Sequence, residues 1–179
     1  MQAQNILHFW FDELTDKQHF AKDAGLDEAI RTRFGATLEA ATRRELFAWR
    51  ATPEGRLAEI IVLDQFSRNV YRDTAPAFAQ DGLALVLAQE LVASGQGQLL
   101  TTAQRRFAYM PYMHSESALI HAQAVTLFAE PGLENGLDFE LRHQAIITRF
   151  GRYPHRNAVL GRASTAEELA FLSQPGSSF

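Results

Sequence analysis

The residues best suited to chemistry lie in three segments that place polar side chains among aromatic and aliphatic neighbours. These signatures are LDQFSRNVYR at residues 63–72, MPYMHSE at residues 110–116 and RFGRYPHRNAVLGR at residues 149–162. Polar groups on apolar stripes are costly unless they contact each other or a ligand. We therefore expect the three signatures to meet in one enclosed site, and this site to hold the function of the protein.

The arginines of these signatures suit the recognition of an anion, because a guanidinium binds carboxylate or phosphate through two hydrogen bonds. Residues 141–166 contain five arginines and two histidines but no acidic residue. Tyr153 and Pro154 begin a new helical turn there, and free backbone N–H groups at such a start attract anions. The candidate ligand-binding residues are Asp64, Arg68, Asn69, Tyr71, Arg72, Ser115, His143, Arg152, Arg156, Asn157 and Arg162.

The histidines could supply acid–base chemistry, because an imidazole titrates near neutral pH. His114, His121 and His143 fall on apolar helical stripes, where a histidine is either a hydrogen-bonded core residue or part of a polar cluster. A carboxylate such as Glu116 or Asp64 could orient one of them. The candidate catalytic residues are His114, Glu116 and His155.

Several other chemistries are excluded or disfavoured by the sequence. There is no cysteine, no H-E-x-x-H pattern and only one copy of the Glu140-x-x-His143 pair that a di-iron bundle needs twice, so we predict no metal and no cofactor. Glycine-rich phosphate loops are absent. Without a G-x-S-x-G elbow, Ser115 is a hydrogen-bonding partner and not a nucleophile.

Composition limits the class of protein further. A chain of 179 residues is long enough for one domain with a sizeable core, and we expect residues 1–179 to form it, with a frayed tail at 173–179. The net charge of −4 and the lack of a recognisable module argue against nucleic acid as a partner. No signal pattern or membrane-length apolar run occurs, which predicts a cytoplasmic protein without membrane contact.

The elements that must position these residues read as helices throughout. Ile30, Phe34, Leu38 and Ala41 form one helical face, and residues 57–70 are apolar on nearly all sides, as in a central helix. With no alternating run, the pattern predicts an all-α fold, an antiparallel array of about seven to nine helices joined by short connections.

Helix ends are marked by capping residues. Thr52 followed by Pro53 predicts a helix start. Thr101 with Gln104, and Ser164 with Glu167, predict capping boxes. Pro111 should kink or divide the long apolar stripe that runs from Phe107 to Phe128.

Together the three signatures resemble the bacterial family catalogued as domain of unknown function 924, and ILHFWFDEL at residues 6–14 resembles its FWF segment. The resemblance covers about residues 6–172. It implies an all-helical, tetratricopeptide-like fold but no established activity. The motif residues that carry over are Asp64, Gln65, Arg68, Asn69, Tyr71, Arg72, His114, Ser115, Glu116, His143, Arg152, Pro154, His155, Arg156, Asn157, Gly161 and Arg162. Ser67, Tyr112 and Tyr153 depart from the proline, leucine and phenylalanine common in the family.

Three hypotheses follow, and whether the protein is an enzyme stays open. In the first, the signatures bind a small phosphate- or carboxylate-bearing molecule between helices, with hydrolytic or transfer chemistry. In the second, a tetratricopeptide-like groove binds a peptide or protein. In the third, the signatures are ion-pair networks that fix helix register. The aromatic N-terminal helix could also support a homo-oligomer. We favour the first hypothesis over the third, and the third over the second.

Overall fold

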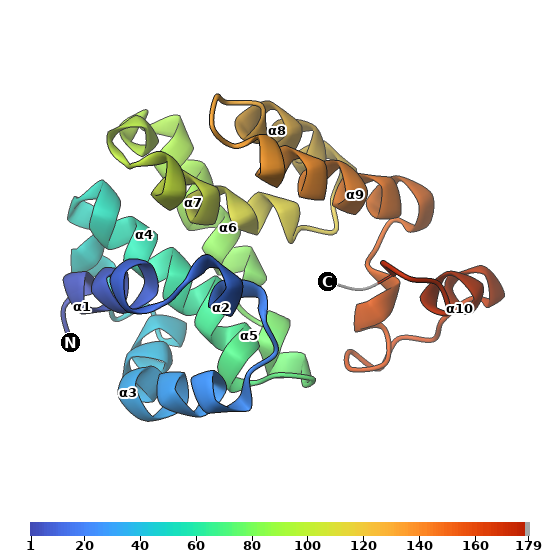
Figure 1. Ribbon diagram of the computed structural model, residues 1–179, viewed down its shortest axis with the longest axis horizontal. Helices are drawn as coiled ribbons and strands as arrows, with labels where there is room; N and C mark the ends of the chain where they lie inside the picture. The colour runs from blue at the N-terminus through green and yellow to red at the C-terminus, as the bar shows by residue number, and fades with distance from the viewer. Residues whose placement is uncertain (178–179) are drawn as a thin grey trace. The chain divides into compact units, whose positions relative to one another are not determined.

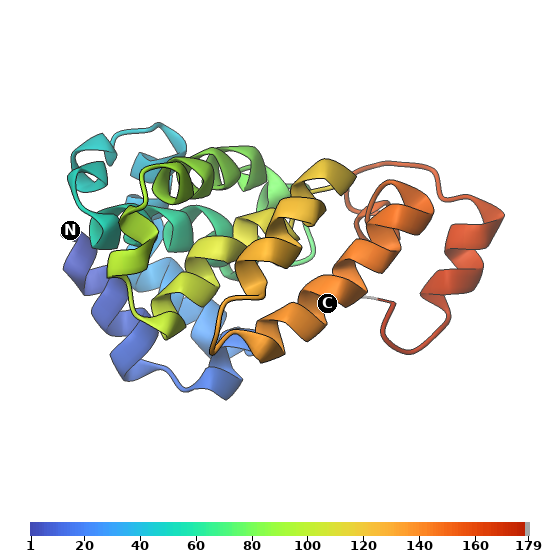
Figure 2. The same ribbon diagram turned by 90° about the horizontal axis from the view of Figure 1, so that it is seen from above.

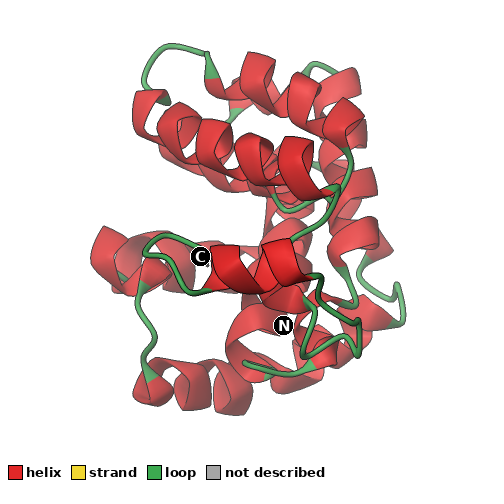
Figure 3. Ribbon diagram, turned by 90° about the vertical axis from the view of Figure 1, so that its right-hand side faces the viewer, coloured by secondary structure: helices red, strands yellow, loops and turns green. Residues whose placement is uncertain are grey.

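The computed structural model describes residues 1–177, and this part of the chain is helical without a single strand (Figures 1 and 3). The predicted all-α array is confirmed. Residues 178 and 179 of the expected tail lie outside the described residues. Two compact units are distinguished: unit 1 comprises Met1–Arg72 and Pro76–Pro111, and unit 2 comprises Asp73–Ala75 and the chain from Tyr112 onward. The expected single domain stays a prediction.

Unit 1 is built from seven labelled helices. They are α1 (Ala3–His8), α2 (Asp16–Phe20), α3 (Ala24–Thr42), α4 (Pro53–Ile61), α5 (Ser67–Val70), α6 (Asp81–Ala93) and most of α7 (Thr102–Met113). Shorter 3₁₀ turns occur at Phe47–Ala51, Ala75–Phe78 and Gln96–Leu99. A π-helical turn at Phe9–Glu13 follows α1.

The centre of unit 1 is the predicted buried helix, which runs from α4 through a π-helical turn at Val62–Phe66 into α5. Leu57 and Leu63 are fully buried, because α1, α3 and α6 pack around this helix. Phe66 lies 5.2 Å from Phe34 and 5.7 Å from Trp10, measured between ring centroids. Aromatic pairs at these separations add to the stabilisation from burial.

The start of α4 depends on two small residues. The Thr52 hydroxyl accepts a hydrogen bond from the backbone N–H of Gly55 at 3.1 Å, which confirms the predicted cap. Gly55 itself is required by space, since a Cβ atom there would lie 2.0 Å from the carbonyl oxygen of Trp49. The chain before α4 therefore packs directly onto its first turn.

We expect Thr52→Ala to lower the free energy of unfolding by about 1 kcal/mol, because the Gly55 N–H loses its cap. Urea unfolding followed by circular dichroism measures the change. Thr32→Ala is the matched control, since Thr32 is exposed on α3 and its hydroxyl bonds only to Glu28. Equal stability of the two variants would contradict a capping role for Thr52.

Unit 2 contains α8 (Ala118–Phe128), α9 (Glu134–Phe150), a 3₁₀ turn at Pro154–Arg156 and α10 (Ala166–Leu172). Helices α8 and α9 lie side by side (Figures 1 and 2). Their approach is close at Gly136, where a Cβ atom would lie 2.7 Å from the Phe128 ring.

Three sequence predictions about elements are tested in these regions. The stripe containing Pro111 is divided, but the break follows Pro111, which lies in the last turn of α7: this helix ends at Met113 and α8 begins at Ala118. The Thr101–Gln104 capping box is confirmed by hydrogen bonds in both directions. The box predicted at Ser164 and Glu167 is wrong by one residue: Thr165 caps α10 and Glu168 closes the box, because Arg152 and Asn157 fix these side chains from outside the helix.

Within residues 1–177, no helix combines the length and the apolar character needed to cross a membrane.

Candidate functional site

The first signature forms ion pairs within unit 1. Arg68 donates from Nη1 to the Asp64 carboxylate at 3.0 Å, the predicted i to i+4 pair, and both its terminal nitrogens bond to Asp81 at 2.9 and 3.0 Å. Asp64 is fully buried, and its other carboxylate oxygen accepts a hydrogen bond from Gln65. A buried carboxylate held in this way needs its guanidinium partner.

The last residues of the same signature form hydrogen bonds and an ion pair with α3. Arg72 bonds bidentately to Asp27 at 2.6 and 2.7 Å, and Asn69 donates to the same carboxylate at 2.8 Å. Burial acts to raise the pKa of Asp27, but the hydrogen bonds from Arg72 and Asn69 outweigh it and keep the pKa below its ordinary value. Asp27 therefore stays charged at neutral pH.

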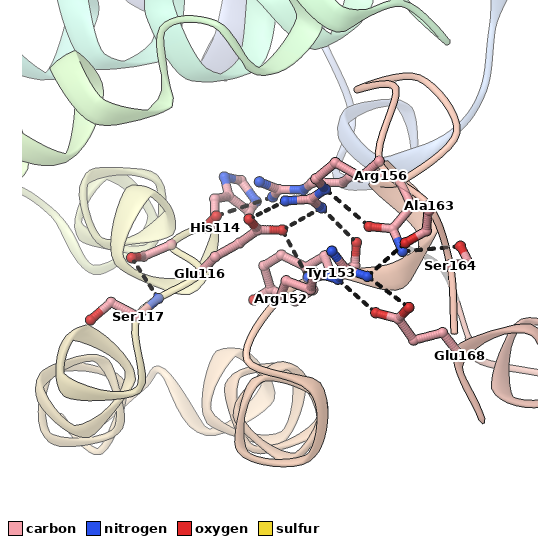
Figure 4. Close-up of polar contacts among 12 residues, drawn as sticks. His114, Glu116, Ser117, Arg152, Tyr153, Arg156, Ala163, Ser164 and Glu168 are labelled. Carbon is pink, nitrogen blue, oxygen red and sulfur yellow. Dashed lines mark hydrogen bonds and ion pairs between the residues drawn. The ribbon is translucent and has the colours of Figure 1, made fainter. Parts of the chain in front are cut away.

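In unit 2, Glu116 links the second and third signatures. Its carboxylate accepts two hydrogen bonds from Arg162, at 2.6 and 2.9 Å, and one from the backbone N–H of Tyr153 at 2.8 Å. Burial acts to raise the pKa of Glu116, yet these hydrogen bonds outweigh it, so the pKa lies below its ordinary value. Figure 4 shows the Glu116 side chain reaching from the segment before α8 toward Tyr153.

A second ion pair joins the third signature to α10. Arg152 bonds bidentately to Glu168 at 2.7 and 2.9 Å and also donates to the Ala163 carbonyl (Figure 4). The hydrogen bonds from Arg152 and from the Thr165 N–H lower the pKa of Glu168 to about 2. Asn157 is buried beside this pair, where it donates to Ser164.

Tyr153 is the centre of the unit 2 cluster. Its side chain is fully buried and its hydroxyl donates to the Met113 carbonyl at 2.5 Å. The guanidinium of Arg156 lies over its ring, 4.5 Å from the centroid, which is cation–π geometry. Arg156 also donates to the His114 carbonyl at 3.1 Å (Figure 4), and only 6% of the residue is exposed.

A buried carboxylate–imidazole pair lies behind Tyr153. Nδ1 of His121 on α8 is 2.6 Å from Oε1 of Glu140 on α9, and both residues are completely buried. Nε2 of His121 donates to the Ser115 carbonyl at 2.8 Å and lies 3.2 Å from the Tyr153 hydroxyl. Burial raises the pKa of Glu140, and the contact with His121 opposes this increase.

Imidazoles gather around the same tyrosine. The centroid of the His143 ring lies 5.7 Å from that of Tyr153, and the centroid of the His155 ring lies 5.5 Å from it. Nδ1 of His143 donates to the Phe139 carbonyl at 2.7 Å. Burial lowers the pKa of His143 to about 3, this hydrogen bond opposes the decrease, and charge on His114, His121 and His155 adds to it.

Comparison with known proteins places this arrangement in a family. The model of a family described as bacterial protein of unknown function (DUF924) matches residues 6–176. The chain belongs to the DUF924 family. A similar solved structure, the protein of unknown function ATU0120 from Agrobacterium tumefaciens, is 38% identical, with a TM-score of 0.90, and the match covers 95% of this chain and 96% of that chain. No curated protein gives a match.

In this DUF924 protein, the second and third signatures meet as predicted within unit 2, through Glu116, Arg162 and Tyr153. The first signature finds the partners described above within unit 1, and the predicted meeting of all three signatures stays a prediction. Tyr71 ends α5 as a half-exposed residue of unit 1. The Ser115 hydroxyl accepts from the Ser117 N–H at 3.2 Å, a local hydrogen-bonding role.

Sequence reasoning missed three residues of the DUF924 cluster as site candidates: Tyr153, His121 and Glu140. Glu116 was considered as the partner of a histidine, but it holds Arg162, and the carboxylate that contacts an imidazole is Glu140. His121 and Glu140 lie on the facing sides of α8 and α9. The signal that could have found them is a polar residue at a core-facing position of each helix. His114 lies in the turn after α7 and not on a helical stripe.

Among residues 1–177 of the DUF924 protein, no group of three or more histidine, aspartate or glutamate side chains is arranged to hold a metal ion. The contacts of the imidazoles around Tyr153 are with aromatic rings, with backbone carbonyls and, for His121, with the Glu140 carboxylate.

Proposed function

We propose that this protein binds a small molecule carrying phosphate or carboxylate, through Arg156, His114 and His155 in unit 2. The single observation that carries the proposal is the position of the Arg156 guanidinium. It lies over the Tyr153 ring at 4.5 Å and donates to the His114 carbonyl, and the rings of His143 and His155 lie near the same tyrosine. A concentration of cationic and protonatable groups in a poorly hydrated place favours an anion.

The remaining charged groups of the cluster supply a frame for this proposed site. Glu116 and Arg162 offset each other, as do Glu168 and Arg152. We propose that these pairs, and those of Arg68 and Arg72 in unit 1, fix the register of the helices. In each pair the guanidinium binds a carboxylate through two hydrogen bonds. In this division of roles, the network hypothesis accounts for Arg68, Arg72, Arg152 and Arg162. The ligand hypothesis assigns Arg156 on the position of its guanidinium over the Tyr153 ring, near Glu116, whose pKa its charge helps to lower.

The imidazoles of His114 and His155 give the proposed site an acid–base capacity. A histidine beside a bound anion can donate a proton to a leaving oxygen or accept one from water. Hydrolytic or transfer chemistry on the bound molecule is the reaction class that fits these groups. Chromogenic phosphate and carboxylate esters test for it directly, with His155→Gln as the variant that should lose any turnover.

The test of binding is isothermal titration with inorganic phosphate, followed by a library of phosphate- and carboxylate-bearing metabolites. We expect Arg156→Ala to abolish measurable binding and Arg156→Lys to weaken it, because lysine keeps the charge but not the planar fork. Arg142→Ala is the matched control, since Arg142 is an exposed arginine of the same unit that pairs with Asp138.

Two results would contradict the proposal. One is a native protein that binds no member of the library. The other is a ligand whose affinity is equal in Arg156→Ala and Arg142→Ala, which would place binding elsewhere on the chain.

A further inference from the structure

We infer that His121 and Glu140 form a positioning pair, whose buried hydrogen bonds hold the two anchors of Arg156 in place. This inference rests on the proposed function, because Arg156 is the ligand-holding residue in both. The pair itself lies out of reach of a ligand, since both residues are completely buried. It would act only through the groups that it holds.

The first anchor is the backbone between α7 and α8. Arg156 donates to the carbonyl of His114, and the carbonyl of the next residue, Ser115, accepts from Nε2 of His121 at 2.8 Å. Two consecutive carbonyls are thus fixed, one by the pair and one by Arg156. Loss of the His121 bond would let this segment turn and move the acceptor that orients the guanidinium.

The second anchor is the Tyr153 ring. Its hydroxyl donates to the Met113 carbonyl, so the hydroxyl oxygen is the acceptor toward Nε2 of His121 at 3.2 Å. The ring face then carries Arg156 at 4.5 Å. A shift of the hydroxyl end would tilt the ring and displace the cation above it.

The hydrogen-bond chain fixes which nitrogen of His121 carries a proton. A carbonyl oxygen can only accept, so Nε2 must be protonated. Nδ1 either accepts from a protonated Glu140 or donates to the carboxylate, and Nε2–H is retained in both cases. The second oxygen of Glu140 is buried without a hydrogen-bond partner among the described residues, so His121 is the group that satisfies this carboxyl.

This reasoning separates the hydrogen bond from the charge of Glu140. In Glu140→Gln the side-chain amide can donate to Nδ1, which keeps Nε2–H directed at Ser115 and Tyr153. In Glu140→Ala that constraint is lost, and in His121→Ala both anchors are lost. Rescue by glutamine but not by alanine is a pattern that a general loss of packing would not produce.

The experiment measures two properties of folded variants at pH 7. The first is the affinity for inorganic phosphate by isothermal titration. The second is the NMR position of the Arg156 Nε–H resonance, assigned by its loss in Arg156→Lys and shifted upfield by the Tyr153 ring. We expect Glu140→Gln to match the native protein in both, whereas Glu140→Ala and His121→Ala weaken phosphate binding by roughly tenfold and move the resonance downfield.

Each alternative outcome is decisive. If the native protein binds neither inorganic phosphate nor any member of the metabolite library, the proposed function fails, and the resonance still decides whether the pair positions Arg156. An unmoved resonance in folded Glu140→Ala, or a loss in Glu140→Gln equal to that in Glu140→Ala, overturns the inference. Should the alanine variants fail to fold, Tyr153→Phe decides, because it keeps the ring and removes only the hydroxyl, which donates to the Met113 carbonyl and lies against Nε2 of His121: an unmoved resonance then overturns the inference.

Discussion

Replacing Tyr153 by alanine is expected to lower the free energy of unfolding by about 3–5 kcal/mol, which is the usual cost of deleting a large buried aromatic side chain. The ring is fully buried, and three groups depend on it: the Met113 carbonyl, the His121 imidazole and the Arg156 guanidinium. Their loss of partners adds to the cavity left by the ring. Unit 2 should therefore be the part of the molecule that loses protection.

Hydrogen exchange under native conditions, combined with urea unfolding, measures this effect. Protection should fall for amides of α8 and α9 and remain for those of α4, which belongs to unit 1. Phe139→Ala is the control, since Phe139 is an exposed aromatic residue on α9 and should change stability little. A loss for Tyr153→Ala no larger than that for Phe139→Ala would contradict the central role of Tyr153 in packing.

Acid should destabilise the protein through His143. Its pKa in the folded protein is about 3, whereas the unfolded chain has an ordinary value of 6.5. Between these values the unfolded state binds the additional proton, so stability is complete above pH 6.5 and is lost as the pH falls toward 3. Between pH 6.5 and 5, this single group is expected to remove about 2 kcal/mol of unfolding free energy.

The measurement compares urea unfolding at pH 7 and pH 5 for the native protein and for His143→Gln, which cannot titrate. We expect the native protein to lose about 2 kcal/mol more than the variant over this interval. His8→Gln is the control, because it removes an exposed histidine of α1, which lies outside unit 2. Identical pH dependence in the native protein and in His143→Gln would show that His143 binds its proton as readily in the folded protein as in the unfolded chain.

Much of the fold follows from local sequence signals. The cap at Thr52 and the apolar run after it specify α4, and burial of Ile30, Phe34, Leu38 and Ala41 follows from their helical spacing. Helix-capping rules are less accurate where two residues that can cap a helix are adjacent in the sequence. Ser164 and Thr165 are both good caps, and the choice of Thr165 depends on the packing that brings Arg152 against Glu168.

In the candidate site, too, some features follow from local sequence signals and others depend on packing. Residue types and spacing predict Glu116, Arg156 and His155 as candidate site residues, and their role stays a prediction. Spacing alone pairs Asp64 with Arg68, because i and i+4 face each other on a helix. Spacing could not pair Glu116 with Arg162 or His121 with Glu140, since these partners are separated by loops whose course is set by packing.

By itself, the sequence determined that this protein is helical, where α4 and α7 begin, and which side chains are too polar for the apolar stripes they occupy. Only the tertiary structure decided which carboxylate each cation receives and that Tyr153 forms the centre of the cluster in unit 2. The physical reason is range: helix caps and periodicity act over a few residues, whereas ion pairs and ring contacts join segments that meet only when the helices pack.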